Sequence, residues 1–137
     1  MQINTHLSFE GHCEEAFKFY EKALGGKIEM ISTYGTSPMA GDMPAGWDKK
    51  VIHGRVNIAG TIVMGADAPP GRYSKPQGAT LTLSTGNSAD AENYFKALSE
   101  KGAISMPIAE TFFAHRFGMV TDQFGIPWMV IHQKMMP

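Results

Sequence analysis

The sequence has little cysteine and no long apolar run. Cys13 is the single cysteine among its 137 residues, so no internal disulfide can form, which is typical of a reducing cytoplasm. Its longest apolar stretches fall far short of the about 18–20 residues that a membrane helix needs. The first residues have neither the basic region nor the apolar core of a signal peptide. We therefore expect a cytoplasmic protein that does not enter the membrane.

An excess of charge of one sign is also missing. Twelve lysines and arginines stand against 13 aspartates and glutamates, and they are scattered along the chain. Without a basic stripe to hold a phosphate backbone, a nucleic-acid partner is not expected. Hydrophobic residues make up 43% of the chain, which excludes wholesale disorder, and the length suits one compact domain or two small halves.

Two segments have helical periodicity, residues 13–24 and 88–101. In the first, Ala16, Tyr20 and Leu24 recur at helical spacing, and Gly25-Gly26 ends the helix. In the second, Asn87 or Ser88 can cap the start and Gly102 follows the end.

Each predicted helix lies between strand-like runs with alternating apolar and polar residues. For the first helix, one run precedes it at 3–9, and three follow it at 27–34, 51–58 and 61–66. For the second helix, one run precedes it at 79–84, and three follow it at 104–113, 115–121 and 127–132. Ala59-Gly60 and residues 122–125 provide turns between strands. The order βαβββ therefore occurs twice. We predict an α+β fold of one domain over 1–137, in which module one (about 1–68) and module two (about 77–137) form a curved, cup-like mixed sheet.

Two stretches of the chain resemble a known family. The run from His6 to Tyr20 with Leu24-Gly25-Gly26, and the run from Asp122 to Val130, are similar to the opening and closing signatures of the PhnB-like branch of the vicinal oxygen chelate superfamily. That superfamily contains glyoxalase I, bleomycin-resistance proteins, fosfomycin-resistance enzymes and extradiol dioxygenases. The resemblance implies paired βαβββ modules, a homodimer and, in catalytic members, a divalent metal in the cup.

The family's metal ligands come from the first strand of each module and from the last strand, where glutamate is common. Here the first position falls on His6, a competent ligand, the second falls near Thr80 or Thr82, and the third falls on Met129. Neither threonine nor a thioether is a usual ligand of zinc, manganese or nickel. We therefore expect no metal site of the family type and no cofactor.

A small-molecule site remains as the main functional prediction. A cup lined by methionine and aromatic side chains suits a small, partly apolar ligand, and Arg55 or Arg116 could hold an anionic group. The expected ligand-binding residues are His6, His53, Arg55, Met64, Trp128 and Met129. Two Gly- and Pro-rich stretches, residues 35–50 and 67–78, are long enough to be functional loops.

Three other possibilities stay open. In one, the protein is a metal-dependent lyase, isomerase or dioxygenase with His6 as a ligand, in a rearranged site that His53, His115 and Asp67 could complete. In another, the cup is vestigial and the protein serves as an interaction partner. In the third, Cys13 is a nucleophile at a helix start, where the dipole lowers a thiol pKa, although Glu14 and Glu15 act in the opposite direction.

Overall fold

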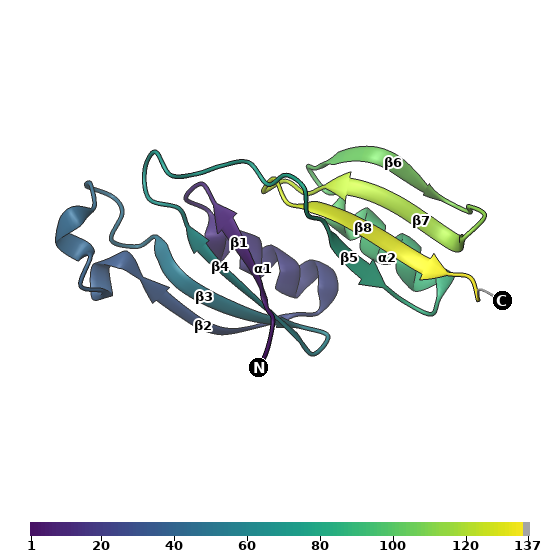
Figure 1. The fold of residues 1–137 in the computed structure, drawn as a ribbon, viewed down its shortest axis with the longest axis horizontal. Coiled ribbons are helices and arrows are strands. Elements are labelled where there is room, and N and C mark those ends of the chain that lie inside the picture. Colours follow the sequence, from purple (N-terminus) through teal and green to yellow (C-terminus); the bar gives the residue numbers. More distant parts are fainter. Residues whose placement is uncertain (136–137) are drawn as a thin grey trace. The chain divides into compact units, whose positions relative to one another are not determined.

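The computed structural model describes residues 1–135, which form two compact units, Met1–Ser74 and Lys75 onward. Unit 1 contains β1 (Thr5–Phe9), α1 (Cys13–Leu24), β2 (Lys27–Thr33), two short 3₁₀ turns (Tyr34–Thr36 and Ala40–Asp42), β3 (Val51–Ile58) and β4 (Thr61–Asp67). Unit 2 contains β5 (Leu81–Ser84), α2 (Ser88–Leu98), β6 (Ala103–Ala109), β7 (Ala114–Thr121) and β8 (Pro127–Gln133). The predicted α+β class with a repeated βαβββ order is confirmed (Figure 1).

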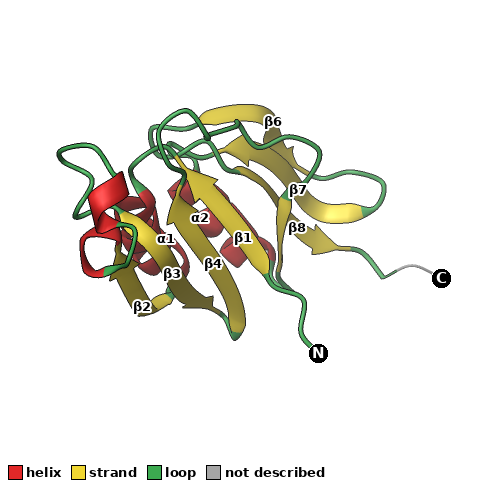
Figure 2. Ribbon diagram, turned by 60° about the vertical axis from the view of Figure 1, so that its left-hand side comes forward, coloured by secondary structure: helices red, strands yellow, loops and turns green. Residues whose placement is uncertain are grey.

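Each unit has one mixed four-stranded sheet with the same topology. The strand orders are β1-β4-β3-β2 and β5-β8-β7-β6, with the first pair parallel and the other pairs antiparallel. Each helix packs on one face of its own sheet (Figure 2). The opposite face of each sheet is called the open face below.

The core of each unit lies between helix and sheet. In unit 1, Phe17 of α1 packs so closely that a Cβ added to Gly65 would lie 2.7 Å from its ring. In unit 2, a Cβ on Gly118 would lie 2.6 Å from the ring of Phe95. Glycine at these strand positions lets an aromatic side chain of the helix approach the sheet backbone.

Most element boundaries agree with the sequence patterns, and the exceptions have local causes. Helix α1 spans the predicted residues and ends at Gly25, which has φ 71°. Helix α2 ends at Leu98, earlier than expected, because the chain then tightens into a turn: the Glu100 N–H donates to the Ala97 carbonyl, three residues back, and Lys101 has a positive φ of 56°. The hairpin at Ala59-Gly60 is confirmed, since both residues have positive φ, 51° and 86°. Strand β1 begins at Thr5, so Ile3 lies outside it and is exposed.

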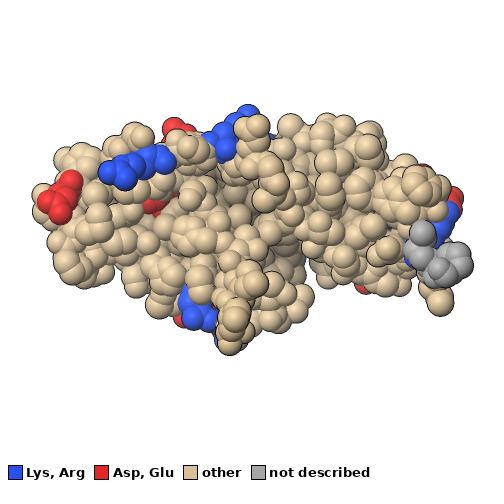
Figure 3. Space-filling view, viewed as in Figure 1, with Lys and Arg blue, Asp and Glu red and all other residues tan. Residues whose placement is uncertain are grey.

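Neither of the helices in the described part of the chain is long and apolar enough to cross a membrane. On the face shown in Figure 3, lysine and arginine side chains are separated by neutral surface rather than gathered in one patch.

Candidate functional site

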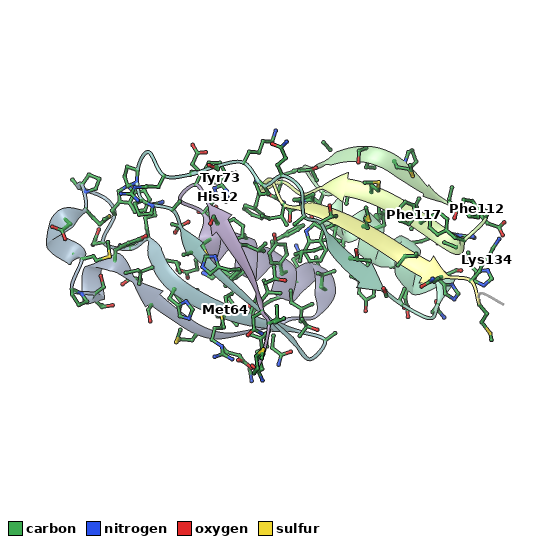
Figure 4. The ribbon with its side chains drawn as sticks, viewed as in Figure 1. His12, Met64, Tyr73, Phe112, Phe117 and Lys134 are labelled. Atoms are coloured by element: carbon green, nitrogen blue, oxygen red, sulfur yellow. The ribbon has the colours of Figure 1, made fainter. Side chains whose placement is uncertain are left out.

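The open face of unit 1 holds a row of side chains that contains three of the predicted site residues, His6, Arg55 and Met64, together with Met30. In the sheet register His6 pairs with Met64, Met64 with Arg55, and Arg55 with Met30. Register partners project to the same face, so these four side chains form one row across β1, β4, β3 and β2. The neighbours Leu7, Val56 and Val63 are buried on the helix side, which places the row on the open face. Met64 of this row is labelled in Figure 4.

His53 belongs to the same face, two residues from Arg55 on β3. The pKa of His6 is lowered from its ordinary value, first by partial burial and then by the charge of His53. The two imidazoles are therefore close enough to interact. A lowered pKa keeps His6 neutral at neutral pH, in which state one ring nitrogen can donate and the other can accept a hydrogen bond.

Arg55 has an unused donor in this row. Its Nε is buried and makes no hydrogen bond, and the nearest carboxylate oxygen, Glu29 Oε1, lies 3.8 Å away. Glu29 also accepts a long hydrogen bond of 3.4 Å from Asn57 Nδ2 through its other oxygen. The Arg55 guanidinium is thus held beside a carboxylate without full hydrogen bonding, and it can accept a further anionic partner.

The donors on this face do not fit a divalent metal. The imidazoles of His6 and His53 lie beside a thioether and the Arg55 guanidinium, and neither of these two groups is a usual ligand of a divalent ion. The positive charge of Arg55 would also repel a metal cation. Asp67, considered above as a ligand, lies on the helix side, where its oxygens accept from the backbone N–H groups of Cys13 and Val51, each at 2.8 Å. The described residues contain no group of three or more His, Cys, Asp or Glu side chains placed to hold a metal ion.

Unit 2 has a corresponding row with different chemistry. Thr82 pairs with Met129, Met129 with Met119, and Met119 with Met106 across β5, β8, β7 and β6. Met129 therefore lies on the open face of its sheet. The row offers one hydroxyl and three thioethers, which makes it a soft, adaptable apolar surface.

Trp128 lies on the other face of β8. It is 5% exposed, and its Nε1 donates to Asp122 Oδ2 at 3.0 Å. The structure therefore does not bring Trp128 together with Met129, because successive residues of a strand point to opposite faces. The indole belongs to the helix-side core of unit 2.

The closing sequence signature organises the β7–β8 turn. Asp122 Oδ1 accepts from the backbone N–H groups of Phe124 and Ile126 at 2.9 and 3.0 Å, in addition to the indole bond. Gly125 has φ 87°, which a side chain would disfavour. The Asp-x-Phe-Gly-x-x-Trp pattern is thus explained by a buried carboxylate that holds its own turn.

The nucleophile hypothesis for Cys13 is not supported. The thiol is fully buried, and burial, followed by the charges of Asp67 and Glu14, raises its pKa. The thiolate is the reactive form, so Cys13 is an inert core residue. The favourable dipole at the helix start is outweighed by desolvation and by the two carboxylates.

Two other residues considered above are engaged within unit 2. Arg116 Nε donates to Glu92 of α2 at 2.7 Å, so this arginine lies on the helix side. The ring of His115 lies 4.6 Å from that of His132, whose Nδ1 is hydrogen-bonded to Ser88 Oγ at 2.9 Å.

Met30 and Met106 could not be assigned to the two rows from the sequence. Register shifts fall between Ile28 and Met30 in β2, and on both sides of Met106 in β6. Such irregularities change which residues share a face, so simple alternation from the strand start gives the wrong side. Pairing with Arg55 and Met119 is the signal that identifies them, and it requires the structure.

Comparisons with known proteins agree with this architecture. The family model described as Glyoxalase/Bleomycin resistance protein/Dioxygenase superfamily matches residues 2–130. The chain is 35% identical to protein YjdN of Escherichia coli (strain K12), over 100% of this chain and 99% of the relative. Among solved structures, protein PA1353 from Pseudomonas aeruginosa superposes with a TM-score of 0.86 at 39% identity, covering 96% of each chain.

A PhnB protein from Bacillus cereus superposes with a TM-score of 0.78 at 27% identity, over 96% of this chain and 98% of that one. These relatives share the fold over almost their whole length, and the PhnB protein bears out the branch suggested by the two signatures. With the repeated βαβββ topology and a matching family model, the chain belongs to the glyoxalase/bleomycin resistance protein/dioxygenase superfamily.

Proposed function

We propose that this protein binds a small, partly apolar molecule with an anionic group on the open face of unit 1, and that it does so without a metal ion. The observation that carries the proposal is the buried Nε of Arg55, which has no hydrogen bond, in a row between Met64 and Met30. A buried N–H without an acceptor is costly, and an incoming carboxylate or phosphate oxygen would relieve that cost.

The neighbouring side chains supply the rest of the recognition. Met64 and Met30 offer polarizable apolar contact on both sides of the guanidinium. His6 and His53 provide hydrogen bonds beside it, and His6 becomes a second cation when it is protonated. A ligand with an anionic head and an apolar body matches this pattern.

The homodimer implied by the family resemblance and the cytoplasmic location expected from the single cysteine are part of the same proposal. The buried single cysteine is compatible with a reducing compartment. Light scattering coupled to gel filtration measures the mass in solution, and a monomer at micromolar concentration would contradict the dimer.

Benzoate is a suitable probe, with benzamide as its uncharged counterpart of similar shape. Calorimetric titration at millimolar concentrations should show binding of benzoate and much weaker binding of benzamide. Arg55→Gln should weaken benzoate binding by about tenfold or more, because a charge-assisted hydrogen bond is lost. Arg116→Gln is the matched control, since Arg116 is paired with Glu92 on the helix side. Absent benzoate binding, or binding that survives Arg55→Gln, contradicts the proposal.

The pH dependence follows from the lowered pKa of His6. Below its folded pKa His6 is protonated, so affinity for benzoate should rise as the pH falls below the ordinary histidine value of about 6.5 and through the lowered pKa of His6, and His6→Gln should flatten this rise. Stability moves in the opposite direction. The contribution of neutral His6 to the free energy of unfolding is fully present above its unfolded pKa of about 6.5, and it is lost as pH falls through the lower folded pKa. Urea midpoints across the same pH range measure this.

Metal analysis tests the alternative. Untagged protein purified without chelator should contain no stoichiometric divalent ion. About one ion per chain that disappears in His6→Ala would favour a metal-dependent lyase, isomerase or dioxygenase and would overturn the metal-free site.

A further inference from the structure

Unit 1 has a cavity at the carboxyl ends of β1 and β4, apart from the open-face row. These strands are parallel and finish together, with Phe9 opposite Asp67. The cavity has a volume of about 390 Å³ and is formed by the residues that follow both strands together with one residue of the preceding loop: Glu10, Trp47, Ala68, Pro69, Pro70, Gly71 and Tyr73. Along β1, Glu10 lies roughly 13 Å from His6, at about 3.3 Å per residue.

The walls of this cavity are held in place by interactions outside it. The Ala68 N–H donates to the Phe9 carbonyl at 2.9 Å, which continues the β1–β4 pairing into the loop. The ring of Trp47 packs edge-on against Tyr34 at 5.6 Å between centroids, and Tyr34 OH donates to the Asp67 carbonyl at 2.7 Å. The Arg72 N–H donates to the Pro69 carbonyl at 2.9 Å and closes the second loop into a turn. The cavity is therefore formed before any ligand binds.

The lining combines aromatic rings with one carboxylate. Glu10 has no ion-pair partner in residues 1–135, although the Lys50 ammonium is nearby and donates to the Gly11 carbonyl at 2.7 Å. The pKa of Tyr73 is raised, first by burial and then by the charge of Glu10, so the phenol stays neutral and lies close to that carboxylate. Figure 4 shows Tyr73 at the end of the unit where β1 finishes.

We propose that this cavity, lined by Trp47, Tyr73 and Glu10, binds the alkylammonium group of a small organic molecule. Aromatic faces attract a cation through the ring quadrupole, with tryptophan the strongest, and a quaternary ammonium loses little hydration on entering such a site. Glu10 supplies the countercharge, and the prolines and Ala68 supply apolar contact. The volume lies in the range of small-molecule sites. The proposal is independent of anion binding at Arg55.

Choline and 3,3-dimethylbutan-1-ol are matched probes, since the second replaces the trimethylammonium group with an uncharged group of the same shape. Calorimetry should detect choline binding at millimolar concentration or below, and the alcohol should bind at least about fivefold more weakly. The indole N–H resonance of Trp47 should shift on addition of choline, whereas that of Trp128, in the core of unit 2, should not.

Variants separate the contribution of the aromatic rings to choline binding from that of the Glu10 carboxylate. Trp47→Leu should abolish detectable choline binding, and Glu10→Gln should weaken it by about fivefold. Tyr73→Leu should also weaken binding, and Tyr73→Phe should not, since the ring rather than the hydroxyl makes the contact. Because Trp47 also packs on Tyr34, circular dichroism is used to verify the fold of Trp47→Leu, and Tyr73→Leu gives a second reading. Glu29→Gln, on the open face, is the control that leaves choline binding unchanged.

Equal affinity for choline and the alcohol would show that the cavity recognises only apolar shape and not the positive charge, and it would overturn the proposal. Choline binding that is unchanged in both Glu10→Gln and Tyr73→Leu would overturn it as well.

Discussion

Units 1 and 2 share one strand topology but place different chemistry at corresponding positions. In unit 1, Leu7 of the first strand pairs with Gly65, and in unit 2, Leu83 of the first strand pairs with Val130. The residue before each leucine, His6 or Thr82, begins the open-face row. The second position of the row is a methionine in both units, Met64 and Met129. The third position is Arg55 in unit 1 and Met119 in unit 2. Both open-face rows therefore contain thioether sulfur, but only the row of unit 1 contains an imidazole and a guanidinium.

The two helices also begin differently. Helix α2 is capped locally, since Asn87 Oδ1 accepts from the Asp90 N–H at 2.9 Å. In α1 the side chain of His12 makes no capping bond, and the carboxylate of Asp67 accepts from Cys13 N, 54 residues away. Unit 2 has His132 at the position of Asp67, and it hydrogen-bonds Ser88, the first residue of α2. The comparison teaches that a long-range carboxylate can replace a local cap.

The largest expected effect on stability is that of Asp67→Ala. It leaves two buried backbone N–H groups without acceptors, so the free energy of unfolding should fall by about 2–5 kcal/mol. His132→Ala should cost only about 1 kcal/mol, because Ser88 is partly exposed and can bond to water. Urea denaturation followed by circular dichroism measures both, with the exposed Asp42→Ala as control. A loss for Asp67→Ala no larger than that for His132→Ala would show that the carboxylate is not the stronger support.

A second test concerns the glycines beneath the helix aromatics. Gly65→Ala and Gly118→Ala should each cost about 1–3 kcal/mol through overpacking. Gly118→Ala should cost more, because its Cβ would lie 3.0 Å from the backbone Cα of Ile108, whereas the nearest backbone atom to a Cβ on Gly65 is the Leu7 carbonyl oxygen at 3.2 Å. Thermal unfolding provides the measurement, and Gly86→Ala, with open space around it, is the control. If Phe17→Leu fails to recover stability in the Gly65→Ala background, contact with the ring is not the cause.

The smallest expected effect is at the local cap. Asn87→Ala should lower the free energy of unfolding by about 1 kcal/mol, and Asn87→Ser should retain most of it, because serine also caps helices. Urea midpoints of the two variants and the parent give the answer. If Asn87→Ala lowered the free energy of unfolding as much as Asp67→Ala does, the long-range carboxylate would not be a stronger support than the local cap.

Features that depend on nearby residues could be predicted from the sequence. The spacing of Ala16, Tyr20 and Leu24 gave α1, and Gly25 gave its end. Alternation placed His53 and Arg55 on one face of β3, and Asp122 marked the last turn. The placement of Trp128 could not be predicted, because an apolar aromatic on an alternating strand suits either face until the helix covers one of them.

Local sequence patterns were sufficient to predict the doubled βαβββ order, the starts of both helices, the end of α1, the turns and the family. These depend on periodicity, capping and φ preferences, which act over a few residues. Tertiary contacts were needed to show that Asp67 holds the start of α1 and of β3, that Met30 and Met106 join the open faces, and that Glu10, Trp47 and Tyr73 line one cavity. Those outcomes require strand pairing, strand irregularities and contacts between residues far apart in the chain, which no local pattern encodes.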